Sequence, residues 1–102
     1  MHTATTTPAA PFTLGRLLMT PGARQALITA GIDPFDLLAR HAAGDWGLVC
    51  AEDWEANNDA AREGDRLLSA YPLDPDRSEG PRVWIITEAN RLATTLLLPE
   101  EY

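Results

Sequence analysis

The spacing of apolar residues changes once along this chain of 102 residues, close to Gly64, and this change restricts the fold more than any other feature. Before Gly64 the apolar side chains recur every three or four residues, as they do on one face of an α-helix. After Gly64 they fall in short stretches typical of β-strands. Helices that come first and strands that come after predict an α+β domain, with the helices packed on one face of a sheet.

Prolines and glycines mark where the predicted helices begin and end. Thr20 and Asp33 are residues that cap helices well, and each is followed by a proline at the first helical position. Glycine supplies the left-handed residue that often ends a helix. We therefore predict three helices, which run from Pro21 to the residue before Gly31, from Pro34 to the residue before Gly44, and from Ala51 to Glu63.

Three strands are predicted after the helices, at residues 66–71, 82–87 and 93–98, as an antiparallel meander. Residues 12–19 mix alternating and contiguous apolar residues, so we expect only an extended or docking segment there. Trp84 is expected in the core, and Trp46 is expected to fold back onto it from a turn. Residues 1–11 are rich in Thr, Ala and Pro and are expected to form a flexible tail, which leaves residues 12–102 as one domain.

The charge and the rare residue types exclude several classes of function. Fifteen acidic and eight basic residues give a formal net charge of −7, which argues against a protein that holds nucleic-acid backbones non-specifically. All the basic residues are Arg, so Schiff-base lysines and Walker-type phosphate loops are excluded. The single Cys50 rules out an intramolecular disulfide and fits a cytoplasmic protein. No apolar run reaches the ~18 residues of a membrane span, so no membrane partner is expected.

Most of the net charge falls between Asp45 and Asp65, where seven acids accompany one Arg. One interpretation is a negative surface that binds a basic protein partner or imitates nucleic-acid phosphate. The other is a solvated helix face, which is what a run of charge usually means. The candidate partner-binding residues are Asp45, Glu52, Asp53, Glu55, Asp59 and Glu63.

A second set of residues has the composition of a small ribonuclease site. His41 supplies a proton donor or acceptor, and Asp45 nearby is a candidate to orient its ring. Arginines and hydroxyl groups on the strands are suited to hold a phosphate. The simpler interpretation makes His41 a helix-terminal residue that bonds the last carbonyl groups, and the strand residues ordinary cross-strand pairs. The candidate catalytic residues are His41, Arg66, Tyr71, Thr87 and Arg91, and we expect neither a metal nor a cofactor.

Several short motifs occur along the chain in a recognisable order. They are Thr20-Pro21-Gly22-Ala23, Ala39-Arg40-His41, Gly44-Asp45-Trp46-Gly47, Glu55-Ala56-Asn57, residues 66–71, residues 84–89 with Arg91, and residues 94–102. Together they resemble a widespread family of small bacterial proteins that are often encoded on plasmids and other mobile elements. The family carries the labels "plasmid-related protein" and, sometimes, type I restriction subunit M, although this chain is too short for a methyltransferase and lacks its glycine-rich loop. Asn90 departs from the family pattern, which has an acidic residue there.

Two hypotheses follow for the function. The resemblance implies a small acidic accessory protein of the mobile-element type, which acts by binding a protein partner and serves, for example, as an inhibitor of a defence system or a toxin. The order of helices and strands also resembles RelE- and barnase-like endoribonucleases at the level of architecture, which implies metal-independent RNA cleavage. The two hypotheses differ in one geometric expectation, because only the nuclease needs His41, Arg66 and Arg91 to meet in one cleft.

Overall fold

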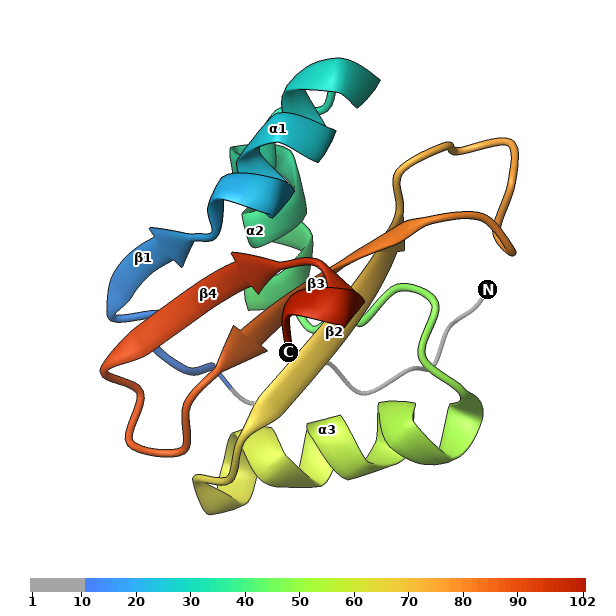
Figure 1. The fold of residues 1–102 in the computed structure, drawn as a ribbon. Coiled ribbons are helices and arrows are strands. Elements are labelled where there is room, and N and C mark those ends of the chain that lie inside the picture. The colour runs from blue at the N-terminus through green and yellow to red at the C-terminus, as the bar shows by residue number, and fades with distance from the viewer. Residues whose placement is uncertain (1–10) are drawn as a thin grey trace.

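The computed structural model describes residues 11–102, which form three α-helices and a four-stranded mixed sheet (Figure 1). The α+β class and the three predicted helices are confirmed, whereas residues 1–10 of the predicted tail lie outside the described residues. In the part of the chain described, no helix is both long and apolar enough to cross a membrane. The elements are β1 (Arg16–Met19), α1 (Pro21–Ala30), α2 (Pro34–Ala42), α3 (Ala51–Glu63), β2 (Leu67–Pro72), β3 (Arg82–Thr87), β4 (Ala93–Leu97) and the 3-10 helix η1 (Pro99–Glu101).

Strand β1 is the main correction to the predicted fold. The sheet has the order β1-β4-β3-β2, and β1 runs parallel to β4, so the sheet is mixed and is not a three-stranded antiparallel meander. The pairs β2–β3 and β3–β4 are antiparallel, as predicted. All four residues of β1 are exposed. An edge strand exposed on both faces has no alternating pattern of polar and apolar residues, which explains why the sequence predicts only an extended segment.

The helices begin and end at the residues that cap them. The Thr20 hydroxyl accepts a hydrogen bond from the Ala23 N–H at 3.1 Å, and the Asp33 carboxylate accepts one from the Phe35 N–H at 2.9 Å. Gly31 and Gly64 take the left-handed conformation that ends α1 and α3, with φ of 71° and 83°. These local hydrogen bonds and turns are encoded by neighbouring residues, so the sequence pattern predicts them well.

Helices α1 and α2 pack on one face of the sheet, where Leu27, Leu38, Tyr71, Ile85 and Leu96 belong to one buried cluster. Helix α3 lies along β2 (Figure 1), and it belongs to a second cluster around the fully buried Trp46. The prediction for Trp46 is thus confirmed.

Trp84 lies on the opposite face of the sheet and is only half-buried, so the prediction that it belongs to the core is wrong. Its ring meets the Tyr102 ring, just after η1, at a centroid distance of 5.7 Å. Residues alternate between the faces of a strand, and Trp84 is out of phase with Val83 and Ile85, which face α1 and α2.

The outer edge of β2 is closed by segments that precede it in the chain. The Leu48 N–H donates to the Ala70 carbonyl at 2.7 Å, and the Ala70 N–H donates to the Trp46 carbonyl at 3.1 Å. Next to this bridge, the Asn57 side-chain amide donates to the Leu68 carbonyl at 2.7 Å and accepts from the Leu68 N–H at 3.2 Å. The amide of Asn57 therefore replaces the peptide group of a further strand.

Replacing Asn57 by Ala is expected to lower the free energy of unfolding by about 2 kcal/mol, because the part-buried N–H and C=O groups of Leu68 lose their partner. Urea unfolding followed by tryptophan fluorescence measures this change. The matched control is Glu55→Ala on the exposed side of the same helix, which is expected to stay within about 0.5 kcal/mol of the parent. Equal effects of the two substitutions would contradict the edge-closing role of Asn57.

Candidate functional site

His41 lies at the centre of the described domain and is fully buried. The last turn of α2 places its ring against the sheet face. Its Nδ1 lies 2.5 Å from the Ser69 hydroxyl on β2, and its Nε2 lies 2.9 Å from the Thr87 hydroxyl on β3. The imidazole thus joins one helix to two strands, and it does not bond the carbonyl groups at the end of its own helix.

The hydroxyl groups continue this network to β4 and to the segment before β1. The Thr87 and Thr94 hydroxyls lie 2.7 Å apart, and the Thr94 hydroxyl donates to the Leu14 carbonyl at 2.7 Å. Because Thr94 donates to Leu14, it accepts from Thr87, and Thr87 in turn accepts from His41. This order places a proton on Nε2, so in the neutral ring Nδ1 accepts from the Ser69 hydroxyl. Every polar atom of the ring then has a partner.

Aromatic rings seal the network from solvent. Phe12 and Trp46 both meet the His41 ring edge-on, at centroid distances of 5.6 and 5.4 Å. The Arg91 guanidinium lies over the Phe12 ring, 5.6 Å from its centroid. With Phe12 in this place, no substrate reaches His41 without displacing part of the core.

Burial, helped by the positive charge of Arg91, lowers the pKa of His41 to about 4. The histidine is therefore neutral at pH 7, in agreement with the assignment of Nε2 as a donor and Nδ1 as an acceptor. A strongly shifted pKa often marks a functional site, but buried structural networks shift pKa values in the same way. Here burial and the positive charge of Arg91 account for the shift.

Tyr71 and Asp45 form a separate structural unit next to this network. The Tyr71 hydroxyl donates to the Asp45 carbonyl at 2.6 Å, and burial raises the pKa of Tyr71 to about 12. The Asp45 carboxylate pairs with Arg40 at 2.7 Å, which holds the pKa of Asp45 below its usual range. Asp45 therefore orients Arg40 and not His41, so the predicted His41–Asp45 pair is wrong. The Arg40 guanidinium also lies 4.6 Å from the centroid of the Tyr71 ring.

Arg91 holds the end of α3 in place. Its guanidinium donates to the Asp65 carbonyl at 2.6 Å, to the Glu88 carbonyl at 3.1 Å and to the Ala60 carbonyl at 2.9 Å. Its backbone has a φ of 61°, which is unusual for a residue other than glycine. All three acceptors are backbone groups of this chain, so the arginine is occupied by structural hydrogen bonds.

Arg66 lies apart from His41. Alternation along β2 places Arg66 on the face opposite Ser69, where its guanidinium lies 4.9 Å from the Tyr102 ring centroid and 4.0 Å from the Glu88 carboxylate. Of the five candidate catalytic residues, the structure brings only Thr87 into hydrogen-bond contact with His41. Ser69 and Thr94 also belong to the hydrogen-bond network of His41, but they are not among the candidate catalytic residues. The sequence contains a signal for both, because each is a polar residue that lies two positions along its strand from a hydrophobic residue packed with α1 and α2.

Four acidic residues of α3 form a straight stripe on its surface. Glu52, Glu55, Asp59 and Glu63 are exposed, and their spacing of three and four residues places them on the helix side opposite the buried Ala60 and Ala61. We call these four residues the acidic stripe, and it extends for about 16 Å along the helix. Arg62 at its margin pairs with Asp59.

The two other candidate partner-binding acids lie outside the acidic stripe. Asp45 pairs with Arg40. Asp53 projects from another side of α3, and it lines an open cavity of about 390 Å³ together with Asn57 and Arg66.

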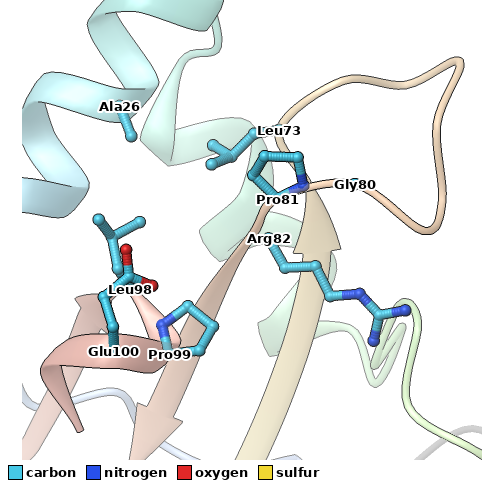
Figure 2. Close-up of a pocket in the computed structure, with 8 residues that line it drawn as sticks. All are labelled: Ala26, Leu73, Gly80, Pro81, Arg82, Leu98, Pro99 and Glu100. Atoms are coloured by element: carbon cyan, nitrogen blue, oxygen red, sulfur yellow. The ribbon is translucent and has the colours of Figure 1, made fainter.

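Another open cavity, of about 430 Å³, lies between α1, the loop before β3 and η1 (Figure 2). Figure 2 shows the Arg82 side chain pointing away from Ala26 and Leu73. The Arg82 guanidinium donates to the Ser78 carbonyl at 3.1 Å. Neither this cavity nor the one beside Asp53 is lined by His41. Among residues 11–102, no three His, Cys, Asp or Glu side chains gather as a metal site requires.

The buried imidazole makes stability depend on pH in a defined direction. Above pH 6.5 His41 is neutral in both states, and its full contribution to stability is present. As the pH falls, the unfolded chain binds a proton that the folded chain resists until about pH 4. The contribution is therefore expected to fall by about 1.4 kcal/mol per pH unit in that interval, or about 3 kcal/mol in total.

Urea unfolding at a series of pH values, on the parent and on His41→Gln, isolates this contribution. Glutamine keeps a donor and an acceptor but does not titrate, while both proteins share the same carboxylates. The free energy of unfolding of the parent is expected to fall more steeply between pH 6.5 and 4. Parallel pH dependences would show that the folded protein accepts the proton on His41 without cost.

Replacing Arg91 by Ala is expected to lower the free energy of unfolding by about 2 kcal/mol, because three carbonyl groups lose a charged donor. Arg66→Ala is the matched control, since the Arg66 side chain is 43% exposed and makes no hydrogen bond with any of residues 11–102. It is expected to change stability by at most about 0.5 kcal/mol. Chemical unfolding of both variants measures the difference. A larger loss for Arg66→Ala would reverse the assignment of roles.

No model of a known protein family matches this chain, and no curated protein or solved structure matches it either. The resemblance to mobile-element proteins therefore stays a prediction from sequence motifs. The features of the molecule that bear on its function are the buried histidine network inside the domain and the acidic stripe on its surface.

Proposed function

We propose that this protein acts by binding a basic protein partner through the acidic stripe of α3. The observation that carries this proposal is the arrangement of Glu52, Glu55, Asp59 and Glu63 in one exposed line, with a single arginine beside it. Four like charges on one helix side repel each other and lower the stability of the free helix. A partner with positive charge removes this cost on binding, and it is also attracted from a distance.

The way α3 is attached to the domain supports this role. Its contacts with the rest of the protein come from the opposite side of the helix, where Asn57 closes the edge of β2 and Ala60 and Ala61 are buried. Arg91 fixes the end of the helix through the Ala60 carbonyl. The carboxylates are thus presented on a rigid support, which reduces the entropy lost when a partner binds.

In this proposal the chain is a small accessory protein of the mobile-element type, as the motif resemblance implies. An inhibitor of a defence system or of a toxin fits the charge, because proteins that act on nucleic acids carry basic surfaces and an acidic stripe offers them a substitute for phosphate. In this proposal the protein works in the cytoplasm, where the exposed thiol of Cys50 stays reduced.

The ribonuclease hypothesis receives less support from the geometry. General acid–base catalysis needs a group within hydrogen-bond reach of the substrate, whereas His41 is fully buried and both of its ring nitrogens are engaged. Arg66 and Arg91 do not meet at His41, and no described feature favours RNA cleavage over binding.

Neutralising the acidic stripe tests the proposed function. The stripe variant carries Glu52→Gln, Glu55→Gln, Asp59→Asn and Glu63→Gln. The control variant carries Asp36→Asn, Asp76→Asn, Glu79→Gln and Glu100→Gln, four exposed acids outside α3, so both variants have the same net charge. In pull-downs at low salt, the parent and the control are expected to retain a protein that the stripe variant loses.

The dependence on salt distinguishes a stripe contact from an apolar one. Raising the salt from about 0.05 M to about 0.5 M is expected to release the partner from the parent, because screening shortens the range of the attraction. Equal capture by the stripe variant, or no partner at low salt, would contradict the proposal.

A further inference from the structure

The edge of the sheet formed by β1 carries an exposed apolar patch. The side chains of Leu17, Leu18 and Met19 are 45%, 39% and 38% exposed, and Phe35 at the start of α2 is 66% exposed. A shallow cavity of about 190 Å³ connects these four side chains. Single exposed apolar residues are ordinary on a protein surface, but a contiguous group on a sheet edge marks an interaction surface.

Among residues 11–102, no backbone hydrogen bond is made by the groups of β1 that face away from β4. The Arg16 N–H donates to the Leu92 carbonyl at 2.9 Å, and the Thr20 N–H donates to the Leu96 carbonyl at 3.0 Å. Backbone groups of successive strand residues point to opposite sides, so Arg16, Leu18 and Thr20 face β4. The N–H and C=O groups of Leu17 and Met19 therefore point away from the sheet, and β1 is an end strand of that sheet (Figure 1).

We propose that a second copy of this chain pairs with this edge, with the two β1 strands antiparallel and centred on Leu18. In that register Leu17 of one copy lies opposite Met19 of the other, and the two residues exchange both of their backbone hydrogen bonds. The two sheets join into one continuous sheet of eight strands. The Leu17 and Met19 side chains of both copies lie on the same face as α2, where the two Phe35 rings cover them.

Charge complementarity selects a second copy as the partner. The register places Arg16 of one copy directly opposite Thr20 of the other, on the face that carries η1. The Thr20 hydroxyl lies 2.5 Å from the Glu101 carboxylate, so Arg16 reaches that carboxylate in the second copy. Arg16 makes no ion pair within the described residues, and the two-fold symmetry forms the Arg16–Glu101 contact twice.

The distribution of the remaining charge also permits this pairing despite the net charge of −7. The acidic stripe lies beyond β2, at the far side of the sheet from β1. With strands about 4.8 Å apart and helices about 10 Å from a neighbouring element, the two stripes of a dimer lie about 50 Å apart. This distance is several times the range of electrostatic repulsion at physiological salt, which is about 8 Å.

Sedimentation equilibrium on the full chain tests the dimer, with a charge swap as the specific probe. Arg16→Glu and Glu101→Arg alone are each expected to raise the dimer dissociation constant at least about tenfold, since each brings like charges together. The double variant restores opposite charges and is expected to return to within about threefold of the parent. Arg77→Glu, in the exposed loop before β3, is the matched control for the change of charge and is expected to leave the constant unchanged.

Leu17→Pro tests the backbone pairing independently of charge. Proline removes an N–H that points away from β4, so the sheet within each copy is kept while the contact between copies is lost. Its thermal unfolding at low concentration checks that the fold is intact. A monomeric parent at about 1 mM chain, a folded Leu17→Pro variant that still dimerises, or a double charge-swap variant no better than the single ones would overturn the proposal.

Discussion

The arrangement of the domain depends on one buried imidazole that is hydrogen-bonded on both sides. His41 comes from α2, and its partners Ser69 and Thr87 come from neighbouring strands, so the ring fixes the distance between helix and sheet as well as the position of that helix along the strands. Leaving either nitrogen without a partner inside the core costs more than the hydrogen bond itself contributes. The need to pair both ring nitrogens therefore excludes arrangements in which α2 is shifted along the strands. An apolar residue at position 41 would allow such shifts. Phe12 and Trp46 complete the arrangement by excluding water from the ring.

The sequence predicts the local parts of this structure and misses the parts that depend on distant residues. Capping residues, prolines and glycines determine α1, α2 and α3 through contacts with their neighbours in the chain, which is why the three helices are confirmed. Strand β1 forms because β4, near the other end of the described chain, provides its partner. Likewise, nothing near His41 in the sequence points to Ser69 and Thr87, whereas Asp45 is close in sequence and yet binds Arg40. The alternation of residues along the strands did contain one usable signal for the buried network. Polar residues interrupt the apolar positions on the sheet face that packs against the helices, and these residues are Ser69, Thr87 and Thr94.

The two ends of the sheet differ in chemistry, and this difference separates two modes of interaction. At the β2 end, the bridge at Gly47 and the amide of Asn57 close the edge, and α3 adds a layer of negative charge beyond it. At the β1 end the backbone is open and the side chains are apolar. Contacts at the first end depend on ionic strength and act over a distance, whereas contacts at the second are short-ranged and depend on shape. The interior between them holds the only strongly shifted histidine of the described chain, and that residue serves the fold.

The hydrogen bond from Thr94 to the Leu14 carbonyl has a consequence for how the protein is made. During synthesis, the segment around Leu14 leaves the ribosome long before β4 exists, so β1 has no strand to pair with and the Leu14 carbonyl has no Thr94 hydroxyl to accept from. Helices α1 and α2 can form early, because their hydrogen bonds are local. The apolar residues of β1 stay without their partner strand until β4 has been added, which exposes them to chaperones and to other nascent chains in the meantime. A ribosome that stalls before β4 therefore holds a chain with formed helices and no closed core.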